Sequence, residues 1–258
     1  MKRQLAFFAA LLLFSAVSTA SVAADSQVYE VRSYILGEKG DAAAIDSYLE
    51  KALIPALNRQ GIASVGVFAN AANDESGVPR IVVAIPYDSA DDIAKIQKAV
   101  HADQQYLAAG EDYLGRMKKN AAYQRISSEL LVAMDCWPAL KVPEGALKNS
   151  ERVYELRLYE SPSEKLGHLK VHMFNNGEVP IFLDSKIQPI FIGQAVVGPQ
   201  TPSLTYLTMY ENEAARLKAW DAFRAHPDWQ VLKKVAKYKG TVSKNNTCIM
   251  VPKPYSQM

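Results

Sequence analysis

The sequence has no excess charge of one sign and no apolar run long enough to cross a membrane. Its 258 residues include 29 Lys and Arg against 27 Asp and Glu, and Lys2 and Arg3 account for the difference. A balanced charge on the rest of the chain provides no general field that would attract nucleic acid or an anionic membrane surface. We therefore expect no nucleic-acid partner and no stable membrane insertion.

The sequence also lacks the signatures of several common enzyme classes. It has no glycine-rich phosphate loop, no nucleophile elbow and no HExxH helix, so nucleotide transfer, α/β-hydrolase and metalloprotease chemistry lose their usual support. Cys136 and Cys248 are too few for a zinc site. In an oxidising compartment they could form a structural disulfide, or they could be two buried thiols, and the sequence leaves both open. We assign no cofactor and no metal site.

Residues 1–24 have the pattern of a secretory signal. Lys2 and Arg3 precede an apolar run over 5–17, and small residues end at Ala24. This is the charged, apolar and small-residue order of an export signal, and the run falls short of the roughly 20 residues that span a bilayer. We expect cleavage after Ala24 and a periplasmic or secreted mature protein.

The remainder of the chain reads as two copies of one unit. The segment 28–34 (VYEVRSY) recurs 125 residues later as 153–159 (VYELRLY), and the same offset relates His101 to His226. Several landmarks in one order indicate a duplication. The expected organisation is a first unit over 25–137, a linker over 138–150 and a second unit over 151–258.

Each copy has the element order β-α-β-β-α-β. Alternating or β-rich runs predict the strands, and apolar stripes at helical spacing predict the helices. In the first copy we expect strands over 28–35, 62–68, 80–85 and 128–134, with helices over 41–58 and after Asp88. In the second copy we expect strands near 152–160, 187–197, 203–210 and 241–251, with helices near 163–184 and 212–237.

This order is the split βαβ pattern of ferredoxin-like folds, in which two helices cover one face of a four-stranded sheet. The other face of each sheet needs cover. We therefore predict an α+β fold in which tandem ferredoxin-like units form an intrachain pseudo-dimeric α+β barrel, and the alternative is two independent modules on a flexible linker.

The second copy resembles the NIPSNAP domain over about residues 152–258, because many blocks occur in the order of that family. The blocks are Tyr154-Glu155-Leu156-Arg157, Met173-Phe174, Gly177-Glu178, Ile181-Phe182, Pro189, Phe191-Ile192-Gly193, Gly198, Leu204-Thr205-Tyr206-Leu207, Ala219-Trp220, Phe223-Arg224, Pro227-Asp228-Trp229, Thr241-Val242-Ser243, Pro252 and Pro254-Tyr255-Ser256. The first copy keeps Tyr29-Glu30-Val31-Arg32 but lacks counterparts of Trp220 and Trp229. The resemblance implies an exported bacterial member of the dimeric α+β barrel superfamily, which includes cofactor-free monooxygenases, haem-handling proteins and binding modules.

Two matching polar sets on the first strand of each copy are candidate ligand-binding residues. Alternate side chains of a strand share a face, so in the second copy Tyr154, Leu156 and Leu158 form an apolar face that suits the helices. The opposite face would then direct its polar side chains toward the barrel interior, where Arg and Tyr could bind a polar or carboxylate ligand. The two sets are Glu30, Arg32 and Tyr34, and Glu155, Arg157 and Tyr159. The alternative is that each Glu and Arg form an ion pair that fixes the interface.

Several further residues are weaker candidates. Gln194 and Tyr206 could extend the polar lining, and His226 could be a general base or a helix-end histidine placed toward the helix dipole. His168 and His172 have the spacing of two metal ligands on one helix, but no third ligand accompanies them in the sequence. The aromatic residues near Trp220 and Trp229 could line a pocket, although their spacing favours helix-on-sheet packing.

These features allow three functions. The first is binding of a small organic ligand in a barrel cavity, and the second is a monooxygenase-like reaction that uses His226, Arg157 or Tyr159 to position a substrate. The third is a protein-interaction module with a fully packed interior, and a homo-oligomer is compatible with all three. The fold alone cannot rank them, because the same barrel hosts both enzymes and binding proteins.

Overall fold

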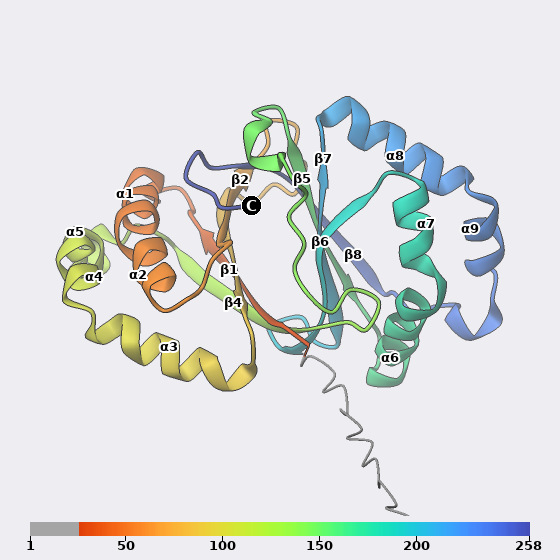
Figure 1. Cartoon of the computed structure of the whole chain (residues 1–258), viewed down its shortest axis with the longest axis horizontal. Helices are drawn as coiled ribbons and strands as arrows, with labels where there is room; N and C mark the ends of the chain where they lie inside the picture. Colours follow the sequence, from red (N-terminus) through yellow and green to blue (C-terminus); the bar gives the residue numbers. More distant parts are fainter. Residues whose placement is uncertain (1–25) are drawn as a thin grey trace, which may run out of the picture.

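The computed structural model describes residues 26–258, so the expected signal sequence and its cleavage site lie outside the described residues. Within this range the strands form one closed barrel, with helices on its two opposite flanks (Figure 1). No helix of residues 26–258 combines the length and the hydropathy that a membrane crossing requires.

The elements follow the predicted order in both halves. The first half contains β1 (Val28–Ile35), α1 (Ala42–Tyr48), a π-helical turn (Leu49–Leu53), α2 (Ile54–Arg59), β2 (Gly66–Asn70), β3 (Arg80–Tyr87), α3 (Ala90–Ala102), α4 (Gln104–Ala109), α5 (Glu111–Leu114) and β4 (Arg125–Ala133). The second half contains β5 (Val153–Glu160), α6 (Glu164–Met173), a π-helical turn (Phe174–Glu178), α7 (Val179–Asp184), β6 (Gln188–Val197), β7 (Ser203–Tyr210), α8 (Glu213–Ala225), α9 (Pro227–Leu232) and β8 (Lys244–Pro252).

Local sequence signals begin and end these helices where expected. The Asp41 carboxylate accepts a hydrogen bond from the Ala44 amide at 3.0 Å and caps α1, and the Asn212 side chain accepts one from the Ala215 amide and caps α8. Both satisfy amides that have no partner within the helix. Gly61, with φ of +85°, follows the end of α2, in a conformation that only glycine adopts without strain.

The barrel consists of two four-stranded sheets joined edge to edge. Its order is β1-β3-β2-β8-β5-β7-β6-β4, so each half has the ferredoxin-like order β4-β1-β3-β2 or β8-β5-β7-β6. The halves meet at two antiparallel seams, β2 with β8 and β4 with β6. This confirms the predicted α+β barrel, and the alternative of two independent modules is wrong because strands pair across both seams.

The segment between the halves packs against the barrel. The Trp137 indole N–H donates to the Ile190 carbonyl at 3.2 Å, and the Lys141 amide donates to the same carbonyl at 2.9 Å. The Leu140 amide donates to the Gln27 side chain at 2.8 Å. These contacts hold the connection across one end of the barrel.

Aromatic and apolar side chains fill that end of the barrel interior. The rings of Tyr29 and Phe191 lie 4.9 Å apart, and those of Phe68 and Tyr154 lie 4.7 Å apart. The Met258 side chain is fully buried in the same cluster. Two further clusters lie between the sheet and the helices, one in each half. Both faces of the sheet are therefore buried.

This arrangement corrects the predicted strand phase. Tyr154 and Leu156 belong to the cluster inside the barrel, whereas Tyr159 packs in the cluster beneath the helices of the second half. The first copy has the same phase, with Tyr29 and Val31 inside and Tyr34 beneath the helices. The prediction that the Glu, Arg and Tyr sets face the barrel interior is wrong.

Candidate barrel-mouth site

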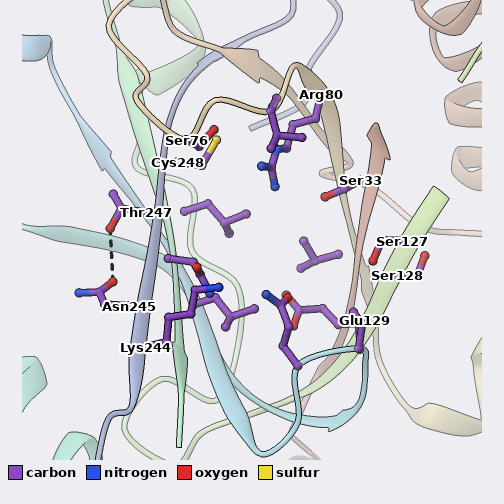
Figure 2. Close-up of a pocket in the computed structure, with 17 residues that line it drawn as sticks. Ser33, Ser76, Arg80, Ser127, Ser128, Glu129, Lys244, Asn245, Thr247 and Cys248 are labelled. Carbon is purple, nitrogen blue, oxygen red and sulfur yellow. Dashed lines mark hydrogen bonds between the residues drawn. The ribbon is translucent and has the colours of Figure 1, made fainter. Parts of the chain in front are cut away.

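The barrel interior opens into a cavity of about 450 Å³ at the end opposite the aromatic cluster. Figure 2 shows side chains that line this space, among them Ser33 of β1, Arg80 of β3, Glu129 of β4 and Cys248 of β8. We call this cavity the barrel mouth. Its volume falls within the range of about 300–1,000 Å³ that is usual for small-molecule sites.

Small polar side chains leave this end of the barrel unfilled. Ser33 of β1 lies directly opposite Ser127 of β4 in the strand register, and Tyr29 and Phe191 occupy the interior near the other end. The same alternation therefore places aromatic rings at one end and hydroxyl groups at the other. The difference in side-chain volume produces the cavity.

Among the described residues that line the barrel mouth, Glu129 is the one acid, and it is deeply buried. Its residue is 8% exposed, and its Oε2 accepts a hydrogen bond from the Thr205 hydroxyl at 3.2 Å. Among residues 26–258, no Lys, Arg or His nitrogen forms an ion pair with it. Burial raises the pKa of Glu129 to about 7, although the Thr205 hydrogen bond lowers it in part. A carboxyl group that changes charge near neutral pH inside a cavity is a typical feature of a functional site.

A glycine allows the connection between β6 and β7 to pass close to Glu129. A Cβ atom built on Gly198 would lie 2.9 Å from the Cβ of Glu129, which is closer than such atoms approach in proteins. The next residues along this connection, Pro199 and Gln200, line the barrel mouth. Gly198 therefore lets this segment cover the acid from the solvent side.

Arg80 supplies a positive charge at the rim of the same cavity. Its Nε donates to the Val78 carbonyl at 3.2 Å. In the part of the chain that the structure describes, no carboxylate forms an ion pair with its guanidinium group. The other cation on the rim, Lys244, is mostly exposed and lies 3.9 Å from a carboxylate oxygen of Glu160.

Cys248 lies on the wall of the barrel mouth across from Glu129. Its Sγ is 3.6 Å from the Asn70 side-chain nitrogen, and burial raises its pKa to about 11. Cys136 is partly buried beside the helix-side cluster of the second half, and burial raises its pKa to about 12. Both thiols are free, so of the two arrangements left open by the sequence the structure contains the unbridged one.

The predicted polar set of the second copy forms an ion-pair network beneath α8. Arg157 donates to Glu155 Oε1 at 2.7 Å, and the other carboxylate oxygen accepts from Arg216 at 3.0 Å and from the Trp220 indole at 2.6 Å. The Arg157 guanidinium also lies 4.4 Å from the centre of the Trp220 ring. Each oxygen of Glu155 therefore has a charged partner, and the network connects β5 to α8.

The equivalent set of the first copy is less complete. Arg32 donates to Glu30 Oε1 at 2.9 Å and to the Tyr34 hydroxyl at 3.3 Å, and Ser128 donates to the same carboxylate oxygen. Glu30 Oε2 is buried without a hydrogen-bond partner among the described residues. The alternative interpretation of both sets, an ion pair within each strand, matches these contacts.

The weaker candidates also lie outside the barrel mouth. Tyr206 is fully buried beneath the helices, where its hydroxyl is 2.7 Å from that of Tyr159. Gln194 lies two residues after Ile192 on β6 and therefore points to the same, helix-covered face of the sheet, where Ile192 packs in the helix-side cluster. His226 follows α8 and caps α9, because its Nδ1 accepts from the Asp228 amide at 3.2 Å. None of the three residues lines the cavity.

The other sequence candidates have structural contacts. His172 Nδ1 lies 2.8 Å from the Tyr238 hydroxyl, and among the described residues no three acidic, His or Cys side chains gather as a metal site. Trp220 and Phe223 are part of the buried cluster beneath α8, as the packing interpretation expects.

Glu129 was not among the candidate residues predicted from the sequence, although its position in a strand gave an indication. The strand predicted over 128–134 places Glu129 on the same face as Leu131 and Ala133. Both of these apolar residues are buried in the barrel interior. A single acid on an otherwise apolar strand face indicates a buried carboxyl group.

Comparison with known proteins agrees with this architecture. Residues 154–257 match the NIPSNAP family model, and no curated protein matches the chain. A protein of Fusobacterium nucleatum subsp. nucleatum, described as a "putative monooxygenase", has a similar structure with a TM-score of 0.57 and 9% identity over 88% of this chain and 93% of its own. A second protein with that description, from Lactobacillus acidophilus, has a TM-score of 0.57 and 11% identity over 88% of this chain and 94% of its own.

These likenesses establish the fold. The chain has the fold of a dimeric α+β barrel, with both halves of the barrel in one polypeptide. The similarity to the NIPSNAP family is confined to residues 154–257, in the second half of the chain.

Proposed function

We propose that this protein binds a small organic molecule in the barrel mouth and that Glu129 is the polar anchor for that molecule. The observation that carries this proposal is a deeply buried carboxyl group with one hydroxyl partner, Thr205, at the wall of a cavity of about 450 Å³. The proposal moves the ligand site from the predicted Glu, Arg and Tyr sets to the inside of the barrel.

The energetics of burial support a ligand at this position. A carboxylate that loses water without gaining a cation or several hydrogen bonds destabilises the folded protein. Glu155 is a buried acid with a structural role, and it receives hydrogen bonds from two arginines and an indole N–H. Glu129 has no such partners within residues 26–258. A bound molecule that donates hydrogen bonds would supply them.

The walls of the barrel mouth support an organic ligand rather than a simple ion. Val31, Leu156 and Leu158 line the cavity beside the serines and the acid. Leu156 retains partial exposure although it lies in the middle of a central strand. An apolar body could cover these side chains, while polar groups bind at Glu129 and at the rim.

The test is the mass of the purified protein under native and denaturing conditions. We expect wild-type protein to carry a non-covalent excess mass, or to take one up from a soaked fragment library. Two variants should lose it: Glu129→Gln removes the charge, and Ser127→Leu fills the cavity. The exposed control Glu164→Gln should retain it. If the native and denatured masses agree for each of the four proteins, and no fragment binds to the wild type, the proposal is contradicted.

A second candidate function is turnover of the bound molecule by a monooxygenase-like reaction. It is favoured by the raised pKa of Glu129, near 7, because a group that titrates near the working pH is suited to proton transfer. The two full-length structural neighbours carry the description "putative monooxygenase". Oxygen uptake that depends on the isolated ligand and is lost in Glu129→Gln would support turnover. Binding without oxygen uptake or product formation would leave the protein a binder.

The interaction-module hypothesis has less support. It depended on a fully packed interior, and the barrel mouth is an open cavity.

We also propose that the protein acts after export, on the basis of the signal pattern over residues 1–24. Cell fractionation tests this proposal, and a full-length, uncleaved protein in the cytoplasm would refute it.

A further inference from the structure

The two halves of the barrel allow the walls of the mouth to be compared position by position. Strand β1 pairs with β4 so that Val31 lies opposite Glu129. In the second half β5 pairs with β8 in the same way, and Leu156 lies opposite Cys248. Glu129 and Cys248 therefore occupy equivalent positions. The duplicated unit has placed an acid on one wall of the mouth and a thiol on the other.

The neighbouring pair shows the same divergence. Ser33 lies opposite Ser127 on the first wall, whereas Leu158 lies opposite Asn246 on the second. Ser33 and Leu158 are equivalent, so one copy has a hydroxyl where the other has an isobutyl group. One wall of the mouth is polar and acidic, and the facing wall is more apolar. A ligand with one polar side and one apolar side would fit in a single orientation.

The rim of the barrel mouth carries a positive charge at Arg80, whereas its wall carries the acid Glu129. Arg80 lies opposite Ile35 at the end of β1, and its equivalent in the second half is Ser203, which lies opposite Glu160 at the end of β5. At this position the first half has a cation and the second half has a serine. Figure 2 shows Arg80 directed into the cavity from β3 and Glu129 entering it from β4.

The two charged groups are too far apart to neutralise each other. Their partners on β1, Ile35 and Val31, are separated by four residues, which is about 13 Å along a strand. Strand β1 lies between β3 and β4, so a further two strand spacings, roughly 9–10 Å, separate Arg80 from Glu129 across the sheet. An Arg and a Glu side chain cannot close this distance to form an ion pair. Neither group therefore serves as the ion-pair partner of the other.

We propose that the ligand of the barrel mouth is an amphipathic zwitterion, with an amine at Glu129, a carboxylate at Arg80 and an apolar segment along Leu156 and Leu158. This inference rests on the proposed binding function and adds the chemical class of the ligand. Arg80 offers the two-pronged donor geometry that suits a carboxylate. Glu129 offers an acceptor that an ammonium group would hold in its ionised form.

Isothermal titration calorimetry with simple probes tests the charge pattern. The probes are 6-aminohexanoate, hexanoate, hexylamine and 1-hexanol, so that charge changes while the apolar chain stays the same length. We expect 6-aminohexanoate to bind at least about tenfold more tightly than any of the other three. Its shorter and longer homologues, 4-aminobutanoate and 8-aminooctanoate, then measure the distance between the two charge sites.

Two variants assign the charges to their residues. Glu129→Gln should lower the affinity for 6-aminohexanoate to that of hexanoate for the wild type, and Arg80→Gln should lower it to that of hexylamine. Lys95→Gln is the matched control for loss of a cation, because Lys95 lies on α3, outside the barrel mouth, and has Asp92 as its partner. The affinity of this variant for 6-aminohexanoate should stay within about twofold of the wild type. Circular dichroism confirms that each variant is folded.

The outcomes separate the two proposals. Equal affinities for the zwitterion and 1-hexanol would overturn the zwitterion inference and leave the binding function in place. An excess native mass from a molecule without an amine or a carboxylate would have the same consequence. If no probe binds and no excess mass is found, the proposed function itself is wrong.

Discussion

Replacement of Glu129 by Gln should stabilise the ligand-free protein at alkaline pH and leave its stability unchanged at acid pH. Burial raises the pKa of Glu129 from the 4.5 of a free Glu to about 7. Between these two values the unfolded chain is ionised while the folded protein holds the proton. Stability therefore falls as pH rises from about 4.5 to about 7 and is constant above that range. Gln has the same shape, remains neutral and can still accept the Thr205 hydrogen bond.

The size of the effect follows from the pKa. Each pKa unit corresponds to about 1.4 kcal/mol, so ionisation of Glu129 in the folded protein costs about 3 kcal/mol at pH 8. We expect the free energy of unfolding of Glu129→Gln to exceed that of the wild type by up to this amount at pH 8. At pH 4 the two proteins should be equally stable, because Glu129 is protonated in both the folded and the unfolded state.

Urea denaturation at several pH values between 4 and 8.5 measures this difference. Glu164→Gln, on the exposed surface of α6, is the control and should follow the wild type throughout. A difference between wild type and Glu129→Gln that does not change with pH would refute the reasoning. So would a wild type that is the more stable protein at pH 8.

Three further variants test side-chain packing and backbone conformation outside the barrel mouth. Trp220→Phe removes the N–H donor to Glu155 and should lower the free energy of unfolding by about 1–3 kcal/mol, as measured by urea denaturation. Lys170→Met leaves Glu178 without the buried partner that it contacts at 2.7 Å, and it should lower the free energy of unfolding by about 3–5 kcal/mol. The double variant with Glu178→Leu should recover most of this loss. An equally unstable double variant would contradict this account. Gly61→Ala should lower the thermal midpoint by a few degrees, corresponding to about 1 kcal/mol, because Gly61 has a positive φ with open space around it; an unchanged midpoint would argue against backbone strain.

The order of elements could be predicted from the sequence because it depends on local patterns. The repeat of 28–34 at 153–159 indicated the duplication, and alternation together with helical stripes located the strands and helices to within a few residues. Barrel closure followed from one physical argument. A four-stranded sheet with helices on one face must cover the other, and the second copy supplies that cover.

The strand phase could not be predicted in the same way, because both faces of this sheet are buried. Alternation shows that Glu155 and Leu156 point to opposite faces but not which face meets the helices. The deciding contacts come from Arg216 and Trp220 on α8, some sixty residues along the chain. An apolar strand face suits the interior of a closed barrel as well as it suits a helix layer. The candidate site was therefore placed on the wrong side of the sheet.

The barrel mouth depends on pairings that a single sequence does not contain. Thr205 reaches Glu129 across 76 residues, and the walls of the cavity come from both copies of the repeat. The sequence contained one indication of the site, which is the single acid on the strand face of Leu131 and Ala133. That this face lies inside the barrel follows from the strand register, which the sequence does not contain.

The two seams between the halves determine how the protein behaves on dilution. Strand β2 meets β8 from Phe68 to Asn70, and β4 meets β6 from Leu130 to Ala133. A barrel assembled from separate chains would dissociate at these seams as its concentration fell. Here residues 138–150 tether the two halves, so closure is a unimolecular event. Closure of the cavity is therefore independent of protein concentration, and its occupancy by the proposed ligand would depend on the ligand concentration alone.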